Sequence, residues 1–423
     1  MSLRSGDREI KVQYLARVEG EGGLEVRLSD GQLVRLRLNI FEPPRLFEAF
    51  LAGRSYEELP DMTARICGIC PVAYQMSSIH AAEDAFGIKV EGQLRKLRRL
   101  MYCGEWIESH TLHVYLLALP DFLKYPSALA MAADYPEVVR QGLRMKRIGN
   151  DLVALLGGRE IHPVSATVGG FSRVPAEGEL RPLLEPLKRA KEVAVEAVAW
   201  LSKLPLPGLT RDIEFVALSH PEEYAMNEGR LISSKGLDIA VREFEDHVEA
   251  RQVAYSSALR YTLKGGGAYS VGPLARVNLN FPLLTPDARR AARDSGIPFP
   301  NSNPFTGIVA RMVEVVHALD EAAQIIEGYE RPEPQLRVEP RAGNGFGITE
   351  APRGSLYHSY RFDGRGIVRR ANIIPPTAQN QAQIEADLRE YIPRLLDLPQ
   401  EEATLRCEMA IRNYDPCIPC SVH

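Results

Sequence analysis

The sequence comprises 423 residues, of which 45% are hydrophobic and 25% are charged, enough to bury a large core. Its 51 basic and 55 acidic residues nearly cancel to a formal net charge of −4, so no strong field favours binding to nucleic acid or to an anionic membrane surface. The chain has no run of eighteen apolar residues and no signal peptide at its start, and we therefore expect a cytoplasmic protein without a membrane span.

The first 60 residues indicate a small antiparallel β meander. Residues 9–18 and 24–41 alternate apolar with polar side chains, and the alternation is interrupted by the glycines at 20–23 and by Asp30-Gly31. The segment 1–60 is thus the first of three that the pattern predicts within one integrated domain.

Residues 61–335 favour a large helical bundle that carries the first cysteine pair. Between Pro71 and residue 204 apolar residues recur at helical spacing, and several prolines fall between or at the ends of these runs. A further helix is expected over Pro304–Tyr329.

The last segment, 336–423, is expected to be α+β and carries the second cysteine pair. Strand and turn signals occupy Gly343–Ile374, and helical spacing follows over 380–412. The predicted fold class is therefore mainly α, a large helical bundle with small antiparallel β segments near both termini.

Two Cys-x-x-Cys pairs lie near opposite ends of the chain, Cys67/Cys70 and Cys417/Cys420. In a chain without an export signal, such pairs favour metal ligation over disulfides. Four thiolates can bind zinc, an iron–sulfur cluster or a soft redox metal. Structural zinc sites usually hold both pairs within one small module, whereas here most of the chain separates them. The fold must therefore bring the two ends together if the pairs act jointly.

The cysteines belong to a series of motifs spread over the whole chain. In order these are Arg17-Val-Glu19-Gly20-Glu, Arg65-x-Cys-Gly-x-Cys, Gly158-Arg159-x-x-His162-Pro163, Glu350-Ala-Pro352-Arg353-Gly354, Pro376-Thr377-x-x-Asn380 and Asp415-Pro-Cys-x-x-Cys-x-x-His423. With these motifs the chain resembles the large, catalytic subunit of nickel–iron hydrogenases, and most of all the soluble cytoplasmic NAD(P)-linked or sulfhydrogenase-type group. The resemblance implies that subunit's fold and the reversible heterolytic cleavage of H2 into protons and electrons.

The resemblance also implies the metals and their ligands. Nickel would be held by all four cysteines, with Cys67 and Cys417 as terminal ligands. Cys70 and Cys420 would bridge nickel to an iron that bears carbon monoxide and two cyanides. Soft thiolate donors suit such a nickel site.

Two motifs would supply the groups closest to the reaction. Glu19 would be the base that exchanges a proton with Cys417, although a strand-end carboxylate of this kind can also be merely exposed. Arg353, with its neighbour Pro352, would lie beside the open metal position and one cyanide. A lone arginine more often forms a surface salt bridge, but the other motifs favour the functional role.

The remaining motif residues would support the centre. Thr377 would donate its hydroxyl to the other cyanide or, alternatively, cap a helix, and Asp415 would orient Arg353 or only cap a turn. A magnesium ion, or iron in its place, would be bound by Glu48, His423 and the backbone carbonyl of Ile373.

The resemblance finally implies partners. The chain has no third cysteine cluster and no Gly-x-Gly-x-x-Gly fingerprint, so electrons would leave through an iron–sulfur small subunit, then through flavin and iron–sulfur subunits of the diaphorase type. Nickel chaperones and a maturation endopeptidase, which removes a short extension after His423, are also expected, so a chain that stops at His423 would be the mature form. The alternatives are a hydrogen-sensing relative with the same ligands and a four-thiolate zinc protein. A respiratory-complex homologue is disfavoured because it lacks the four thiols.

Overall fold

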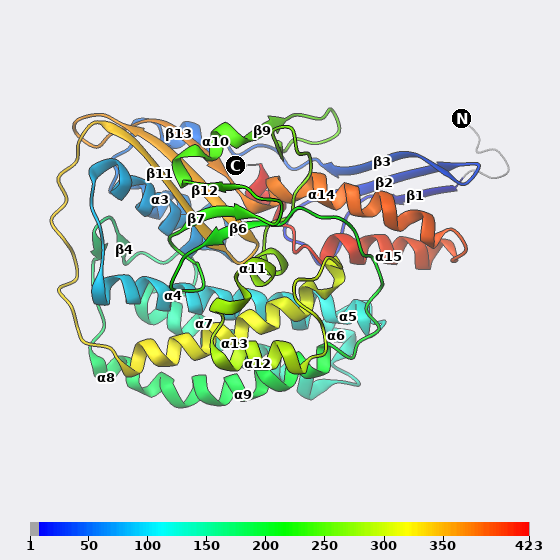
Figure 1. The fold of residues 1–423 in the computed structure, drawn as a ribbon, viewed down its shortest axis with the longest axis horizontal. Coiled ribbons are helices and arrows are strands. Elements are labelled where there is room, and N and C mark those ends of the chain that lie inside the picture. Colours follow the sequence, from blue (N-terminus) through cyan, green and yellow to red (C-terminus); the bar gives the residue numbers. More distant parts are fainter. Residues whose placement is uncertain (1–7, 423) are drawn as a thin grey trace.

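Three antiparallel strands begin the chain in the computed structural model, which describes residues 8–422 (Figure 1). They pair in the order β1-β2-β3 and span Arg8–Val12, Gly22–Ser29 and Gln32–Ile40. Asp30 and Gly31 form the turn between β2 and β3, as predicted, and both have positive φ angles. The first strand ends at Val12 rather than at residue 18. The loop after β1 therefore carries Glu19.

Long helices form most of the body of the molecule, and the predicted helical bundle is confirmed (Figure 1). Pro71 and Pro136 occupy the first turn of their helices, where a missing N–H costs nothing. The long helices are α3 (Pro71–Phe86), α4 (Gly92–Leu112), α7 (Pro136–Gly157), α9 (Leu184–Leu201) and α13 (Gly307–Glu327). Shorter ones are α1 (Phe47–Leu51), α2 (Leu59–Ala64), α5 (Leu119–Phe122), α6 (Ala128–Met131), α8 (Glu177–Leu180), α10 (Phe244–His247), α11 (Pro273–Asn280) and α12 (Pro286–Asp294), with a π-helical segment, His113–Ala118, continuing α4.

Helices α4 and α7 touch backbone to backbone. A Cβ atom placed on Gly149 of α7 would lie 2.5 Å from the carbonyl oxygen of Gly104 in α4. A Cβ atom on Gly104 would lie 3.0 Å from the carbonyl oxygen of Gly149. Only glycine permits this approach, which fixes the position of α4 in the bundle.

The C-terminal segment combines a sheet with helices, as expected. Strands β11 (Gly343–Ala351), β12 (Gly354–Phe362) and β13 (Val368–Ile374) form an antiparallel sheet in chain order. The prediction of one helix over 380–412 was wrong, because helix α14 (Pro376–Tyr391) is separated from α15 (Gln400–Arg412). Pro393 and Pro399 lie in the break, and neither has an N–H to continue a helix. The four-residue helix α16 (Ile418–Ser421) follows.

Further short strands lie in the middle of the chain, where the sequence pattern predicted helices alone. They are β4 (Ala166–Thr167), β5 (Gly170–Phe171), β6 (Val216–Ser219), β7 (Arg230–Ser233), β8 (Asp238–Ile239), β9 (Val248–Arg251) and β10 (Arg260–Leu263). Strands of two to four residues offer too little alternation to be recognised. One hydrophobic cluster includes Leu24, Leu97 and Leu356, so residues of all three predicted segments share a core. The segment boundaries at 60 and 335 remain a prediction.

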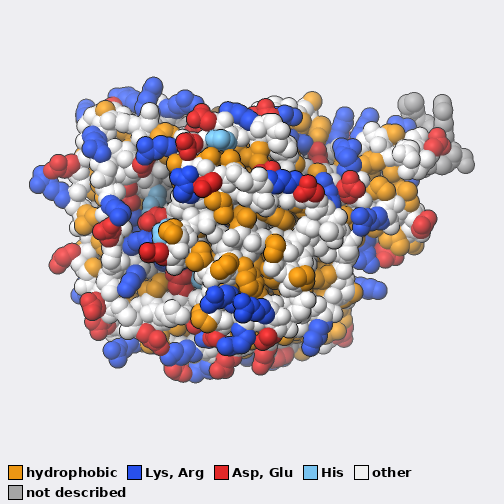
Figure 2. Space-filling view, viewed as in Figure 1, with side chains coloured by type: hydrophobic (Ala, Val, Ile, Leu, Met, Phe, Trp, Pro, Cys, Tyr) orange, Lys and Arg blue, Asp and Glu red, His pale blue; other side chains and the backbone are white. Residues whose placement is uncertain are grey.

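The surface agrees with the nearly balanced composition. On the face shown in Figure 2, basic and acidic side chains are interspersed rather than gathered into a field of one sign. Among the described residues, no helix is long and apolar enough to cross a membrane.

Candidate metal centre

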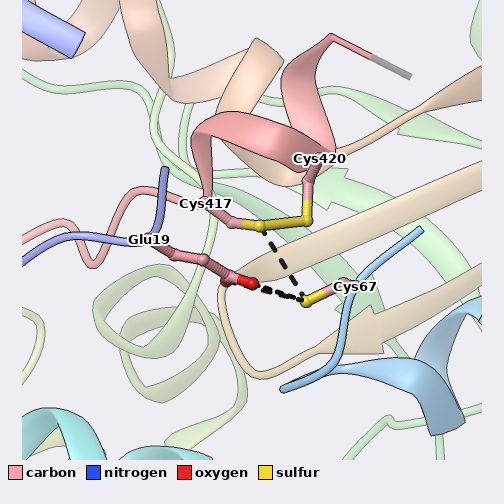
Figure 3. A group of neighbouring side chains, drawn as sticks. All are labelled: Glu19, Cys67, Cys417 and Cys420. Carbon is pink, nitrogen blue, oxygen red and sulfur yellow. Dashed lines mark hydrogen bonds between the residues drawn. A yellow bond between two sulfur atoms is a disulfide. The ribbon is translucent and has the colours of Figure 1, made fainter. Parts of the chain in front are cut away.

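Cysteines from the two ends of the chain meet in the interior. Cys67 lies between α2 and α3, and its sulfur is 3.9 Å from that of Cys417, which directly precedes α16 (Figure 3). One ligand atom from each of Glu19, Cys67, Cys417 and Cys420 can be chosen so that all four lie within 4.8 Å of one another. The sulfur-bearing residues, including Cys70, are at most 3% exposed. The cysteine pairs are thus close enough to act jointly.

The loop that carries Glu19 is attached directly to the C-terminal cysteine segment. Glu19 forms a parallel bridge with Cys417, and its carbonyl accepts the N–H of Ile418 at 2.9 Å. Gly20 has a φ of +88°, and a Cβ atom there would overlap the ring of Pro419. Glycine is therefore needed for the close approach of the two loops.

Cys417 and Cys420 are joined by a disulfide, which differs from the expectation of four free thiols. The turn at the start of α16 places their Cα atoms 5.3 Å apart, within the range that a disulfide spans. Cys67 and Cys70 are free. Because thiolates are the metal-binding form of cysteine, ligation by all four residues requires the reduced C-terminal pair.

Arg353 lies at the tip of the β11–β12 hairpin and points its guanidinium group at the cysteines. Its Nη1 is 3.9 Å from the sulfur of Cys70 and 3.4 Å from a carboxylate oxygen of Glu19. Its Nε donates to the backbone carbonyl of Asp415 at 2.7 Å and lies 3.1 Å from the Asp415 carboxylate. Burial lowers the pKa of Arg353, but Asp415 and Glu19 raise it more, so the result lies well above the usual value. The site therefore holds a fixed positive charge.

Asp415 and Thr377 hold the loop that contains Cys417. Asp415 has a φ of +54°, and Arg353 keeps its pKa below the usual value although burial opposes this. The Thr377 hydroxyl oxygen accepts the N–H of Cys417 at 2.9 Å. Helix α14 has no side-chain cap, so Thr377 does not serve as the cap that was its alternative role. Its hydroxyl proton remains available to a ligand within the site.

Glu19 contacts a different cysteine from the one predicted. Its carboxylate oxygens lie 3.5 and 3.6 Å from the sulfur of Cys67, while its contact with Cys417 runs through the backbone (Figure 3). The reason is the parallel bridge, which directs the Glu19 side chain away from the backbone of Cys417 and toward the opposite pair.

Cys70 precedes the first turn of α3, as Pro71 predicted, but a helix N-terminus does not make it acidic. Burial and the neighbouring Cys67 raise the pKa of the Cys70 thiol well above its usual value. The backbone N–H groups of Val72 and Ala73 instead bind the buried carboxylate of Glu105 at 2.6 and 3.1 Å. No sequence motif had indicated Glu105, which anchors the helix that carries Cys70.

Asp121 is a second residue that the sequence did not reveal. Its carboxylate binds Arg412 at 2.8 and 2.9 Å and also forms an ion pair with Arg17. Arg412 in turn donates to the carbonyl of Ala16 at 3.2 Å. This cluster joins the N-terminal loop that carries Glu19 to the helix that leads into the C-terminal cysteines.

The residues predicted to bind magnesium lie beside a separate cavity. A carboxylate oxygen of Glu48 accepts the N–H of Ile373 at 3.1 Å. Both residues line a cavity of about 170 Å³ together with Ser421 and Val422. His423 lies outside the described residues. Pro352 contacts Arg276 rather than the centre, because its carbonyl accepts the guanidinium Nη2 at 3.0 Å.

Comparison with known proteins places this geometry in a family. The model of the family described as nickel-dependent hydrogenase matches residues 45–140 and 245–423. The chain belongs to the nickel-dependent hydrogenase family. The alpha chain of sulfhydrogenase 2 from Pyrococcus furiosus is 36% identical over 420 residues, 98% of either chain. The vhu hydrogenase of Methanococcus voltae, described as F420-non-reducing, has a large chain that is 31% identical over 414 residues, 90% of this chain and 97% of its own.

Solved structures agree with this assignment of the hydrogenase. A crystal structure of an NAD+-reducing [NiFe]-hydrogenase in the H2-reduced state matches with a TM-score of 0.89 and 27% identity, over 98% of this chain and 99% of the other. The protein is therefore the large subunit of a hydrogenase, an oxidoreductase that acts on H2, and its metals are nickel and iron. The hydrogen-sensing and zinc-protein alternatives are not favoured.

Proposed function

We propose that Cys67, Cys70, Cys417 and Cys420 bind nickel, with Cys67 and Cys417 as terminal ligands and the other two bridging to iron. The single observation that carries this proposal is the meeting of both cysteine pairs in one buried site. The donor set fits, because four soft thiolates suit nickel and iron, and burial excludes competing water. When bound, the metals supply the redox change and the open coordination position at which H2 is split.

Glu19 is proposed as the group that accepts the proton. Its carboxylate lies 3.5 Å from the sulfur of Cys67, close enough to exchange a proton once the centre tightens. Glu19 is also less buried than the cysteines, with 21% of its side chain exposed. It can therefore pass a proton from the interior toward solvent.

Arg353, Thr377 and Asp415 are proposed to set the electrostatics and position of the centre. Arg353 presents a permanent cation beside Cys70, which favours thiolate there against the effect of burial. Asp415 holds that guanidinium by its carboxylate and its carbonyl. We assign the guanidinium and the Thr377 hydroxyl as donors to the two cyanides of an iron that also bears carbon monoxide, and Pro352 as the turn residue that places Arg353.

The electron route is proposed from the relatives. An iron–sulfur small subunit would take electrons from the centre, and diaphorase-type flavin and iron–sulfur subunits would pass them to NAD(P) in the cytoplasm. The similarity to the alpha chain of a sulfhydrogenase and to an NAD+-reducing hydrogenase supports this acceptor. Reduction of NAD(P) by H2 in the purified native complex, with identification of its subunits, tests the route.

Magnesium, or iron in its place, is proposed at Glu48, Ile373 and His423. The cavity lined by Glu48 and Ile373 supports this site because Val422, the residue before His423, also lines it. Nickel chaperones and a maturation endopeptidase would act before the C-terminal segment closes over the cysteines. Metal analysis of the native protein after Glu48→Gln tests the site.

Infrared spectroscopy together with metal analysis tests the main proposal. Carbon monoxide and cyanide bound to iron absorb where polypeptide does not, and we expect these bands with one nickel per chain. Cys420→Ser should lose nickel and the bands, whereas Cys407→Ser, at a buried cysteine away from the centre, should keep both. A variant Cys420→Ser with full H2 uptake would contradict the ligand assignment.

A further inference from the structure

Arg311 is a buried cation without a protein counter-ion. It lies in the second turn of α13 and is 3% exposed. Seven arginines are buried within residues 8–422, and every other one forms an ion pair: Arg98, Arg99, Arg260, Arg276, Arg353 and Arg412. In this described part of the chain Arg311 has neither an ion pair nor a hydrogen bond through its side chain. A buried charge left in this condition is strongly destabilising.

The nearest carboxylates are already engaged by other arginines. Asp415 binds Arg353, and Glu314 binds Arg276 through two hydrogen bonds of 2.7 Å. Burial lowers the pKa of Arg311 to about 10, although Asp415 and Glu314 act to raise it. The guanidinium is therefore still charged at neutral pH, and its charge is not met by a neighbour.

A small cavity lies beside this guanidinium. Its volume is about 20 Å³, enough for one small ion or one or two water molecules, and its walls include Arg311, Ser270 and Asn413. Pro304 and Gly307 also line it, so the N-terminal end of the 21-residue helix α13 faces the same space. A helix N-terminus carries a partial positive charge and favours an anion.

Two donors meet at the start of this helix. A Cβ atom on Gly307 would lie 3.3 Å from Nη1 of Arg311 and 3.4 Å from Nδ2 of Asn413. The Asn413 amide donates one proton to the carbonyl of Pro304 and has a second proton to offer. An acceptor in the cavity would therefore be approached by a guanidinium and an amide from two different elements.

We propose that this cavity binds one small monovalent anion of the size of chloride, which serves as the counter-ion of Arg311. A water molecule would occupy the same volume but would leave the buried charge uncompensated. Asn413 lies two residues before Asp415, so the anion also anchors the segment that leads to the C-terminal cysteines. This site is separate from the proposed metal ligands, and its test does not depend on them.

Bromide diffraction tests the proposal directly. Crystals of the native hydrogenase complex, grown with sodium bromide in place of chloride, should give one anomalous peak in this cavity within hydrogen-bond reach of Arg311. Density there without an anomalous signal would mean water and would overturn the proposal. Arg311→Met should lose the peak, whereas Arg369→Met, at an arginine whose side chain is 55% exposed, should keep it.

A solution measurement gives an independent answer. At constant ionic strength the wild-type complex should unfold at a higher temperature in chloride than in gluconate, which is too large for the cavity. The difference should disappear in Arg311→Met and persist in Arg369→Met. Equal unfolding temperatures of the wild type in the two salts would overturn the proposal, even if Arg311→Met failed to fold.

Discussion

Replacing Asp121 with asparagine tests how the two ends of the chain are held together. The side chains of Asp121 and Arg412 are each 1% exposed, and that of Arg17 is 13% exposed. Asparagine keeps the shape of the side chain but removes the negative charge that two guanidinium groups share. Removal of one partner from a buried ion pair costs about 3–5 kcal/mol, because the other charge stays buried without compensation.

This cost converts into a measurable shift of the unfolding temperature. At about 2.1 cal/mol/K per residue, the 423-residue chain has an unfolding entropy of about 0.9 kcal/mol/K. A loss of about 3–5 kcal/mol therefore lowers the unfolding temperature by about 3–6 °C. Calorimetry of the purified complex at one fixed scan rate measures the shift.

Glu137 provides a matched control because it also pairs with two arginines. Its carboxylate lies 2.9 Å from Arg140 and 3.3 Å from Arg144, and all three side chains are more than half exposed. Surface pairs contribute about 0–1 kcal/mol each, so Glu137→Gln should change the unfolding temperature by less than about 2 °C. Equal shifts in the two variants would refute the argument that burial makes the Asp121 cluster a structural link.

Three further predictions concern the centre and its surroundings. Glu19→Gln should slow exchange of H2 with D2O by about 10²- to 10⁴-fold at unchanged nickel content, whereas Glu21→Gln should not; unchanged exchange would remove Glu19 from the proton path. Thr377→Val leaves the buried N–H of Cys417 without an acceptor and should cost about 1–3 kcal/mol, while Thr377→Ser should unfold like the wild type. Burial lowers the pKa of His110 to about 4, so the unfolded chain binds this proton first. Stability should then fall as the pH drops from about 6.5 to 4, and less steeply in His110→Gln; a flat profile of the wild type would contradict this.

Sequence motifs predicted most of the residues around the centre but not the contacts between them. The cysteines, Arg353, Thr377 and Asp415 lie at loops or helix starts that glycine and proline mark in the sequence, so their local structure could be inferred. The partner of Glu19 could not, because it depends on the parallel bridge between Glu19 and Cys417. Such bridges join segments almost 400 residues apart and leave no local pattern.

Buried polar residues outside the motifs were the main omission. Asp121 and Arg412 are separated by 291 residues, and neither stands in a pattern that distinguishes it from a surface charge. Glu105 lies on a helix whose other residues show ordinary amphipathic spacing, and only the packing of α3 against α4 reveals that it binds α3. The acidity of Cys70 was likewise misjudged, because burial outweighs the helix N-terminus. Each of these properties depends on tertiary environment rather than on neighbours in sequence.

The glycine contact between α4 and α7 has a consequence for the route of the gas. Dihydrogen crosses a protein interior through transient gaps between side chains, and the seam at Gly104 and Gly149 has no side chains that could open one. Closely packed backbone atoms leave no void there. H2 should therefore not permeate through this seam, and it must reach the cysteines by another approach.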